Sequence, residues 1–181
     1  MKTVKNHINV FDFDDTLYRV PGFTCAEAVG KKPYEWFDDP KSLENTETIY
    51  PIINTIEKTW KSDSENSNYL ITHRVLDCKD QVLTLLEKSQ CKFKQVYFLG
   101  RKESKAMKLL EILDENPNAK SLTIYEDSMW EIIQYAQILA DEAPDLEINF
   151  VFVDKSKIIN LKMSSVIQLC DYNDVERIRL I

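Results

Sequence analysis

The chain has 181 residues, which is enough for one domain with a substantial core. Its net charge of −7 argues against a broad nucleic-acid-binding surface, because such surfaces normally carry an excess of lysine and arginine. Only 3 residues are glycine, which excludes a glycine-rich phosphate-binding loop.

The sequence also bears on location and on metal chemistry. It contains no apolar run near the roughly 18 residues that a membrane-spanning helix needs, and its first residues lack the apolar segment of a secretion signal. We therefore expect a cytoplasmic protein without a membrane span. The 4 cysteines are scattered, with no CxxC pair, which favours reduced structural thiols over a zinc site.

Strands alternate with amphipathic helices along the chain. Alternating apolar residues predict a first strand over 8–13, and Pro51 in a first helical turn predicts a helix from that point. The later strands are predicted over residues 68–72, 96–99, 122–125 and 148–153, and the later helices over 77–88, from Ser104, over 129–140 and around 166–178. This order predicts an α/β fold, a three-layer αβα Rossmann-like arrangement with a mostly parallel five-stranded sheet.

Residues 18–50 interrupt the alternation. This segment is rich in proline and aromatic residues, among them Trp36 and Phe37, and has little periodicity. A structureless connection of this length is uncommon unless it is functional or packed against the core. We expect an ordered loop that wraps over the core, although the aromatic side chains are also candidates for a substrate platform.

Chemistry in a parallel sheet collects at the carboxyl ends of the strands. The first strand ends in Asp12, Phe13, Asp14 and Asp15, and strand alternation points the side chains of Asp12 and Asp14 the same way. Two carboxylates this close raise the pKa of one of them, so one can act as a nucleophile and the other as a general acid or base. A divalent cation would relieve the remaining repulsion. The alternative is that the aspartates only form a turn or a cap.

Other chemically useful side chains follow at later strand ends. Thr72 ends the second strand, and Glu126 and Asp127 end the fourth. Lys105 lies in the first turn of a helix that starts at the same edge, where an anion would also meet backbone N–H groups. Taken singly, each has an ordinary explanation as a strand former, a helix cap or a solvated helix face. Together they are the groups that metal-assisted phosphoryl transfer needs.

In this order the groups resemble the haloacid dehalogenase-like (HAD) superfamily, in its capless type. The stretch VFDFDDTLY resembles motif I, and the strand ending in Thr72, His73 and Arg74 resembles motif II, which commonly ends in Thr-Gly-Arg. Lys105 fits motif III, with Lys108 as a second candidate. Residues 125–127 fit motif IV, with Glu131 further along, and the resemblance covers about residues 4–153. Residues 36–43, ITHR and YED are also similar to the HAD domain of Swiss Army Knife RNA repair proteins.

The resemblance implies a mechanism. Asp12 would attack phosphorus to form an aspartyl-phosphate, and Asp14 would serve as the acid and then the base. Thr72 and Lys105 would hold the phosphoryl group. Mg²⁺ would be bound by Asp12, the backbone carbonyl of Asp14, and Asp127, with Glu126 or Glu131 assisting. An aspartate at position 14 implies phosphomonoester hydrolysis.

The resemblance also implies a domain plan and a substrate class. Residues 1–155 would form the catalytic domain and residues 156–181 an extension of that domain. The segment 18–50 is too irregular for a full cap, so we expect an open site and a phosphorylated macromolecule as substrate. The charge of −7 favours a phosphoprotein, with phosphotyrosine as one candidate, over the alternative of a polynucleotide end. A catalytically weak binding or regulatory module remains a further alternative.

Overall fold

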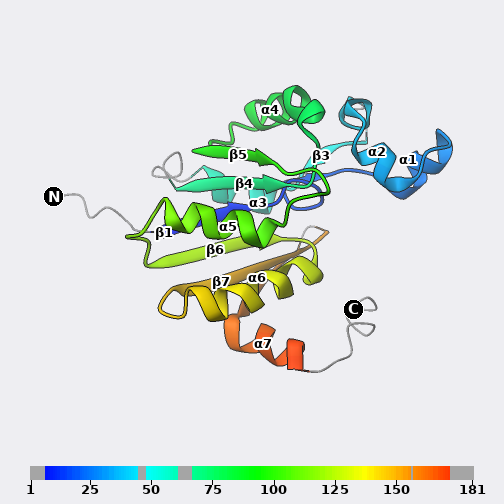
Figure 1. Cartoon of the computed structure of the whole chain (residues 1–181). Coiled ribbons are helices and arrows are strands. Elements are labelled where there is room, and N and C mark those ends of the chain that lie inside the picture. The colour runs from blue at the N-terminus through cyan, green and yellow to red at the C-terminus, as the bar shows by residue number, and fades with distance from the viewer. Residues whose placement is uncertain (1–6, 45–47, 61–66, 156, 172–181) are drawn as a thin grey trace.

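The computed structural model describes residues 7–44, 48–60, 67–155 and 157–171. Within these residues the chain forms a mostly parallel sheet with helices on both faces (Figure 1). The six strands of this sheet are β1 (His7–Phe11), β4 (Asn68–Thr72), β5 (Gln95–Phe98), β6 (Ser121–Glu126), β7 (Glu147–Asp154) and β8 (Lys157–Lys162).

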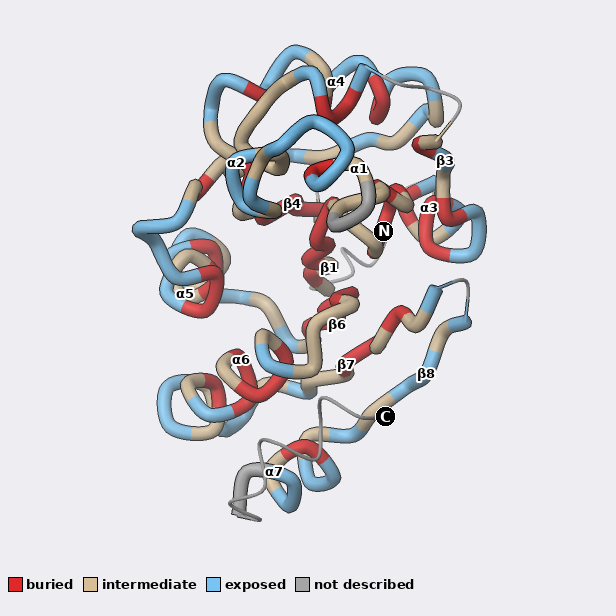
Figure 2. The backbone as a smooth tube through the Cα atoms, turned by 90° about the vertical axis from the view of Figure 1, so that its right-hand side faces the viewer, coloured by how far each residue is buried: buried red, intermediate tan, exposed pale blue. Residues whose placement is uncertain are grey.

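The strand order is β5-β4-β1-β6-β7-β8, and β1 pairs in parallel with β4 on one side and with β6 on the other. The strand order therefore reverses between the neighbouring strands β1 and β6, and in open parallel sheets ligands bind outside the carboxyl ends of the strands at such a point. The central strands are buried along most of their length (Figure 2). The predicted site residues Asp12, Thr72 and Asp127 lie at or just after the carboxyl ends of β1, β4 and β6.

Helices cover the sheet because the strands are apolar on both sides. Val10 of β1 packs in one core with Leu109, Ile132 and Val166, whereas the next residue, Phe11, packs in a second core with Ile56 and others. Adjacent residues of a strand point to opposite faces, so both faces of β1 are buried. The longer helices are α3 (Ile53–Thr59), α4 (Lys79–Lys88), α5 (Lys105–Asp114), α6 (Met129–Glu142) and α7 (Met163–Asp171).

The predicted strand number was wrong, because β8 adds a sixth strand. It pairs antiparallel with β7, from Asn149 opposite Lys162 to Asp154 opposite Lys157. Lys155 lies in the connection with a positive φ of 58°, which reverses the chain within a few residues. The strand is mostly exposed and carries lysine at both ends, as is common at a sheet edge. A polar edge strand has a weak apolar pattern, which explains why sequence periodicity indicated only four further strands after the first.

The segment 18–50 contains several short elements. Helices α1 (Phe23–Ala28) and α2 (Pro33–Phe37) lie together at one end of the molecule (Figure 1). A 3₁₀ turn η1 (Pro40–Leu43) follows, and the strands β2 (Tyr18–Arg19) and β3 (Tyr50–Pro51) pair at the base of the segment. Elements of two to six residues are too short for a visible period. We call residues 18–50 the insertion.

The helices start close to the predicted positions. Ser104 caps α5, because its Oγ accepts a hydrogen bond from the N–H of Met107 at 3.4 Å, and Ser128 caps α6 in the same way through Glu131. A 3₁₀ turn η3 (Leu76–Cys78) precedes α4, so the predicted cap Asp77 lies inside that turn. None of the helices in the described ranges is both long and apolar enough to cross a lipid bilayer.

Candidate active site

Three carboxylates converge at the carboxyl end of the central strands. Asp12 follows β1, Glu126 is the last residue of β6, and Asp127 follows it. Each offers an oxygen, and the three oxygens lie within 4.8 Å of one another. Asp12 and Glu126 are almost completely buried, at 7% and 1% exposure. We call these three residues the carboxylate cluster.

Backbone and side-chain bonds hold the cluster in place. The N–H of Asp12 donates to the carbonyl of Tyr125 at 3.0 Å, so the pairing of β1 with β6 continues one residue past the end of β1. The Oγ1 of Thr16 donates to Oδ1 of Asp127 at 3.4 Å, and Thr16 is fully buried. The cluster is thus fixed by the sheet and by the chain that leaves β1.

Lys105 is the cation of this site. Its Nζ lies 2.8 Å from Oδ1 of Asp12 and 2.8 Å from Oε2 of Glu126, and the residue is buried. Lys108, one turn along α5, instead pairs with Glu111 and lies over the ring of Tyr97. Of the two predicted lysines, the structure brings only Lys105 to Asp12.

The cluster carries more negative charge than Lys105 can balance. Burial raises the pKa of Asp12 to about 7, against the opposing effect of Lys105 and with the help of Glu126. Burial and the neighbouring carboxylates raise the pKa of Asp127 to about 10. Burial works against the charge of Lys105, but Asp12 and Glu126 outweigh it and hold the pKa of this lysine well above its usual value. Two buried carboxylates and a partly exposed one, with one ammonium beside them, are therefore chemically suited to a hard divalent cation, which prefers oxygen ligands.

Thr72 lies at the end of β4 with its side chain completely buried. Its Oγ1 accepts a hydrogen bond from the N–H of Arg74 at 3.1 Å. A hydroxyl that accepts one bond keeps a proton that it can donate, and the fixed position at a strand end suits a donor to an anionic oxygen.

Asp14 lies apart from the carboxylate cluster. Because β1 ends at Phe11, Asp12 and Asp14 follow in an irregular segment rather than in a strand, so strand alternation does not determine where they point. The carboxylate of Asp14 pairs with Arg74, whose Nη2 donates to Oδ1 at 2.7 Å. Among the described residues the three-carboxylate cluster does not include Asp14. Metal binding by its backbone carbonyl stays a prediction.

His73 and Glu131 form a separate pair beside the cluster. The Nδ1–H of His73 donates to the carbonyl of Gly100 at 2.8 Å, and Nε2 lies 3.2 Å from Oε1 of Glu131. The bond to Glu131 raises the pKa of His73, despite burial. Burial opposes the charge of Glu131, but His73 outweighs it and lowers the pKa of this carboxyl. Of the two glutamates proposed as metal helpers, Glu126 lies in the cluster and Glu131 is engaged by His73.

Sequence reasoning gave no role to two residues of this region. Arg74 is 2% exposed and bonds to Asp14, and Thr16 bonds to Asp127. Arg74 lies in the stretch ITHR and Thr16 in the stretch DFDDT, and each stretch follows or ends a predicted strand. This position near a strand end was the one sequence feature that could have marked the two residues as part of the site. The partner of each side chain depended on the tertiary fold.

Removing the lysine charge tests the arrangement. Lys105→Met would leave the carboxylates of Asp12 and Glu126 buried beside each other without a cation. We expect the free energy of unfolding to fall by about 3–5 kcal/mol at pH 8, measured by urea denaturation without divalent metal. Lys108→Met removes the pair with Glu111 and the contact of the ammonium with the Tyr97 ring, but leaves no buried carboxylate without a cation, and should cost less than about 1 kcal/mol. Equal losses in the two variants would contradict the central position of Lys105.

Comparison with known proteins identified no relative. No protein-family model matched the chain. No curated protein and no solved structure matched it either. The function is therefore argued from the site itself.

Proposed function

We propose that this protein is a Mg²⁺-dependent phosphomonoesterase of the HAD-like type that works through an aspartyl-phosphate. The observation that carries the proposal is the carboxylate cluster with Lys105 between Asp12 and Glu126, at the carboxyl end of the central strand. The parallel order around β1 supports a Rossmann-like αβα fold, because in such folds ligands bind where the strand order reverses.

Asp12 is the proposed nucleophile. Lys105 bonds one of its oxygens, Oδ1, and orients the carboxylate, which leaves Oδ2 as the attacking atom. Attack forms an O–P bond to Asp12 and breaks the bond between phosphorus and the leaving oxygen. Asp14 gives a proton to that oxygen, then removes a proton from the water that hydrolyses the aspartyl-phosphate. The products are the alcohol and inorganic phosphate, and Asp12 is regenerated.

Mg²⁺ would be held by Asp12 and Asp127, with Glu126 and the backbone carbonyl of Asp14 as further oxygen donors. When bound, it supplies positive charge that offsets the carboxylates and the phosphoryl oxygens. Thr72 and Lys105 supply an O–H and an N–H to the phosphoryl group. Their burial excludes water from this side of the reaction.

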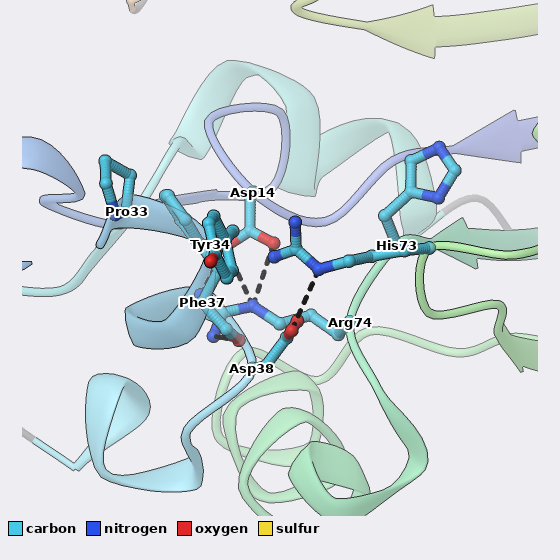
Figure 3. A pocket seen from close by; sticks show the side chains of 8 residues that line it. Asp14, Pro33, Tyr34, Phe37, Asp38, His73 and Arg74 are labelled. Carbon is cyan, nitrogen blue, oxygen red and sulfur yellow. Dashed lines mark hydrogen bonds and ion pairs between the residues drawn. The ribbon is translucent and has the colours of Figure 1, made fainter. Parts of the chain in front are cut away.

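The proposed substrate is a phosphorylated macromolecule, with a phosphoprotein preferred. Asp14 opens onto a hollow of about 400 Å³ that the insertion borders through Tyr34, Phe37 and Asp38 (Figure 3). An open hollow can accept a side chain that projects from a larger molecule. The net charge of −7 is unfavourable for a polynucleotide, which is the alternative substrate.

A substrate panel tests this proposal. The wild-type protein would be incubated with Mg²⁺ and with phosphotyrosine peptides, phosphoserine peptides, and oligonucleotides that carry a 3′- or 5′-phosphate. We expect phosphate release from peptides with a kcat/KM at least about 10-fold above that for oligonucleotides, since like charges slow the encounter with a polyanion. Faster release from an oligonucleotide end would support the polynucleotide alternative. No release from any substrate would support the binding-module alternative and overturn the proposal.

A further inference from the structure

Arg74 is a buried cation at the junction of three parts of the molecule. It follows β4, and its side chain is 1% exposed, although arginine is rarely buried unless it is fully paired. Its planar guanidinium contacts Asp14 on one edge and the insertion on the other (Figure 3).

The first edge holds the carboxylate of Asp14. Nε donates to Oδ2 at 2.9 Å and to Oδ1 at 3.2 Å, and Nη2 donates to Oδ1 at 2.7 Å. Both carboxylate oxygens are therefore engaged by one rigid fork, which fixes the rotation of the Asp14 side chain. The side chain of Asp14 is still 25% exposed, and it borders the hollow.

The second edge holds the insertion. Nη1 donates to the carbonyl of Phe37 and to Oγ of Ser42, both at 2.5 Å, and the guanidinium lies 4.9 Å from the centre of the Phe37 ring. Phe37 ends α2 and Ser42 lies in η1, so Arg74 contacts two elements of the insertion. Because the guanidinium is planar and rigid, a shift of the insertion that moves Nη1 also tilts Nε and Nη2, which hold the carboxylate of Asp14.

We propose that Arg74 is a positioning residue that couples the seating of the insertion to the orientation of Asp14. The proposal rests on the proposed function, in which Asp14 passes a proton to the leaving group. A buried ion pair is by itself weak evidence for a role in stability. Here Arg74 joins Asp14, the proposed acid, to Phe37, which lines the hollow that the leaving group would enter. That geometry assigns Arg74 a role in the reaction.

The first experiment uses leaving groups of different quality. p-Nitrophenolate departs without a proton, whereas the alkoxide of phosphoserine needs one, so only the second substrate depends strongly on a well-aimed acid. The hydrolysis of the aspartyl-phosphate is common to both substrates, so the comparison uses kcat/KM, which reports the steps up to departure of the leaving group. In Arg74→Gln and Arg74→Lys we expect kcat/KM on a phosphoserine peptide to fall at least about 10-fold more than kcat/KM on p-nitrophenyl phosphate. Asp14→Asn should show the same selectivity, and the double variant should be no worse than Asp14→Asn alone.

Two matched variants separate positioning from stability. Ser42→Ala keeps Arg74 but removes one bond to the insertion, and should show the same selectivity to a smaller extent. Arg101→Gln breaks another link to the insertion, the 2.9 Å pair with Asp38, without touching Asp14. Because Arg101→Gln keeps the bonds from Arg74 to Phe37, Ser42 and Asp14, the ratio of kcat/KM between the two substrates should change less than in Ser42→Ala. Equal losses on both substrates in every Arg74 variant and in Ser42→Ala would overturn the proposal.

The second experiment needs no substrate. Coupling is reciprocal, so weakening the bond between Asp14 and Arg74 must also loosen the insertion. In Asp14→Asn we expect amide hydrogen exchange in residues 33–43 to rise at least about 5-fold, which is the lower end of ordinary coupling. Asp141→Asn makes the same chemical change at an exposed position of α6 and should leave exchange unchanged. Unchanged exchange in Asp14→Asn would overturn the proposed coupling. A wild-type protein that hydrolyses none of the substrates would overturn the proposed function and would leave the exchange result as it is.

Discussion

Replacing Asp12 by asparagine is expected to lower Mg²⁺-dependent hydrolysis of p-nitrophenyl phosphate by at least about 10⁴-fold, because the amide cannot form the aspartyl-phosphate. The same replacement should not lower the melting temperature measured without metal. Burial raises the pKa of Asp12 to about 7, which means that its ionised form is unfavourable in the folded protein. A neutral side chain of the same shape avoids that cost, while Lys105 keeps its contact with Glu126.

Asp15→Asn is the matched control for this variant. Asp15 directly follows Asp14, has a positive φ of 55°, and pairs with Arg19 at 3.1 Å. Asparagine tolerates this backbone conformation, so activity should stay within about 3-fold of wild type. An Asp12→Asn protein that retains activity within a factor of about ten of wild type would rule out Asp12 as the nucleophile.

The second large effect is a Mg²⁺-dependent gain in stability that grows with pH. Asp12 and Asp127 have pKa values of about 7 and about 10 in the folded protein, both raised from the ordinary 3.8. Above about pH 4 the folded state therefore binds more protons than the unfolded state, so stability falls as the pH rises. The contribution of Asp12 is fully present below about pH 4 and is lost as the pH passes about 7. That of Asp127 continues to fall toward about pH 10.

Mg²⁺ competes with these protons for the same oxygens, so its effect should be larger at pH 8 than at pH 6. At a concentration about 100 times the Kd, the melting temperature at pH 8 should rise by roughly 5–10 °C, and chelation should reverse the change. Asp127→Asn removes one proposed ligand and should abolish most of the rise, whereas Asp141→Asn should not. A rise that is equal at both pH values, or that survives in Asp127→Asn, would show that Mg²⁺ binds elsewhere.

The parts of the fold that were predictable are those with a local cause. β4 was predicted over its observed residues, since 68–72 form a short apolar run, and the start of α5 was marked by Ser104. Pro51 shows the limit of such reasoning. It lies in β3 rather than in a helix, because Pro51 pairs with Tyr18, a partner that local sequence does not specify.

The candidate site was predictable to the same extent. The parallel sheet brings the ends of β1, β4 and β6 to one edge, so Asp12, Thr72 and Asp127 were expected there from strand order alone. Which charges pair was not predictable, because pairing depends on side-chain direction and burial. Asp14 and Asp12 are two residues apart, yet one bonds to Arg74 and the other to Lys105.

The central position of β1 has a consequence for how the protein is made. Asn9 pairs with a residue 59 positions later and His7 with one 114 positions later. Contacts between such distant residues form slowly, because a long loop must close before they are gained. On the ribosome β1 must wait until β6 has emerged, so Asp12 meets Glu126 only after all the residues between them have been synthesised. The proposed affinity for a divalent cation would therefore arise only once β1 and β6 have paired.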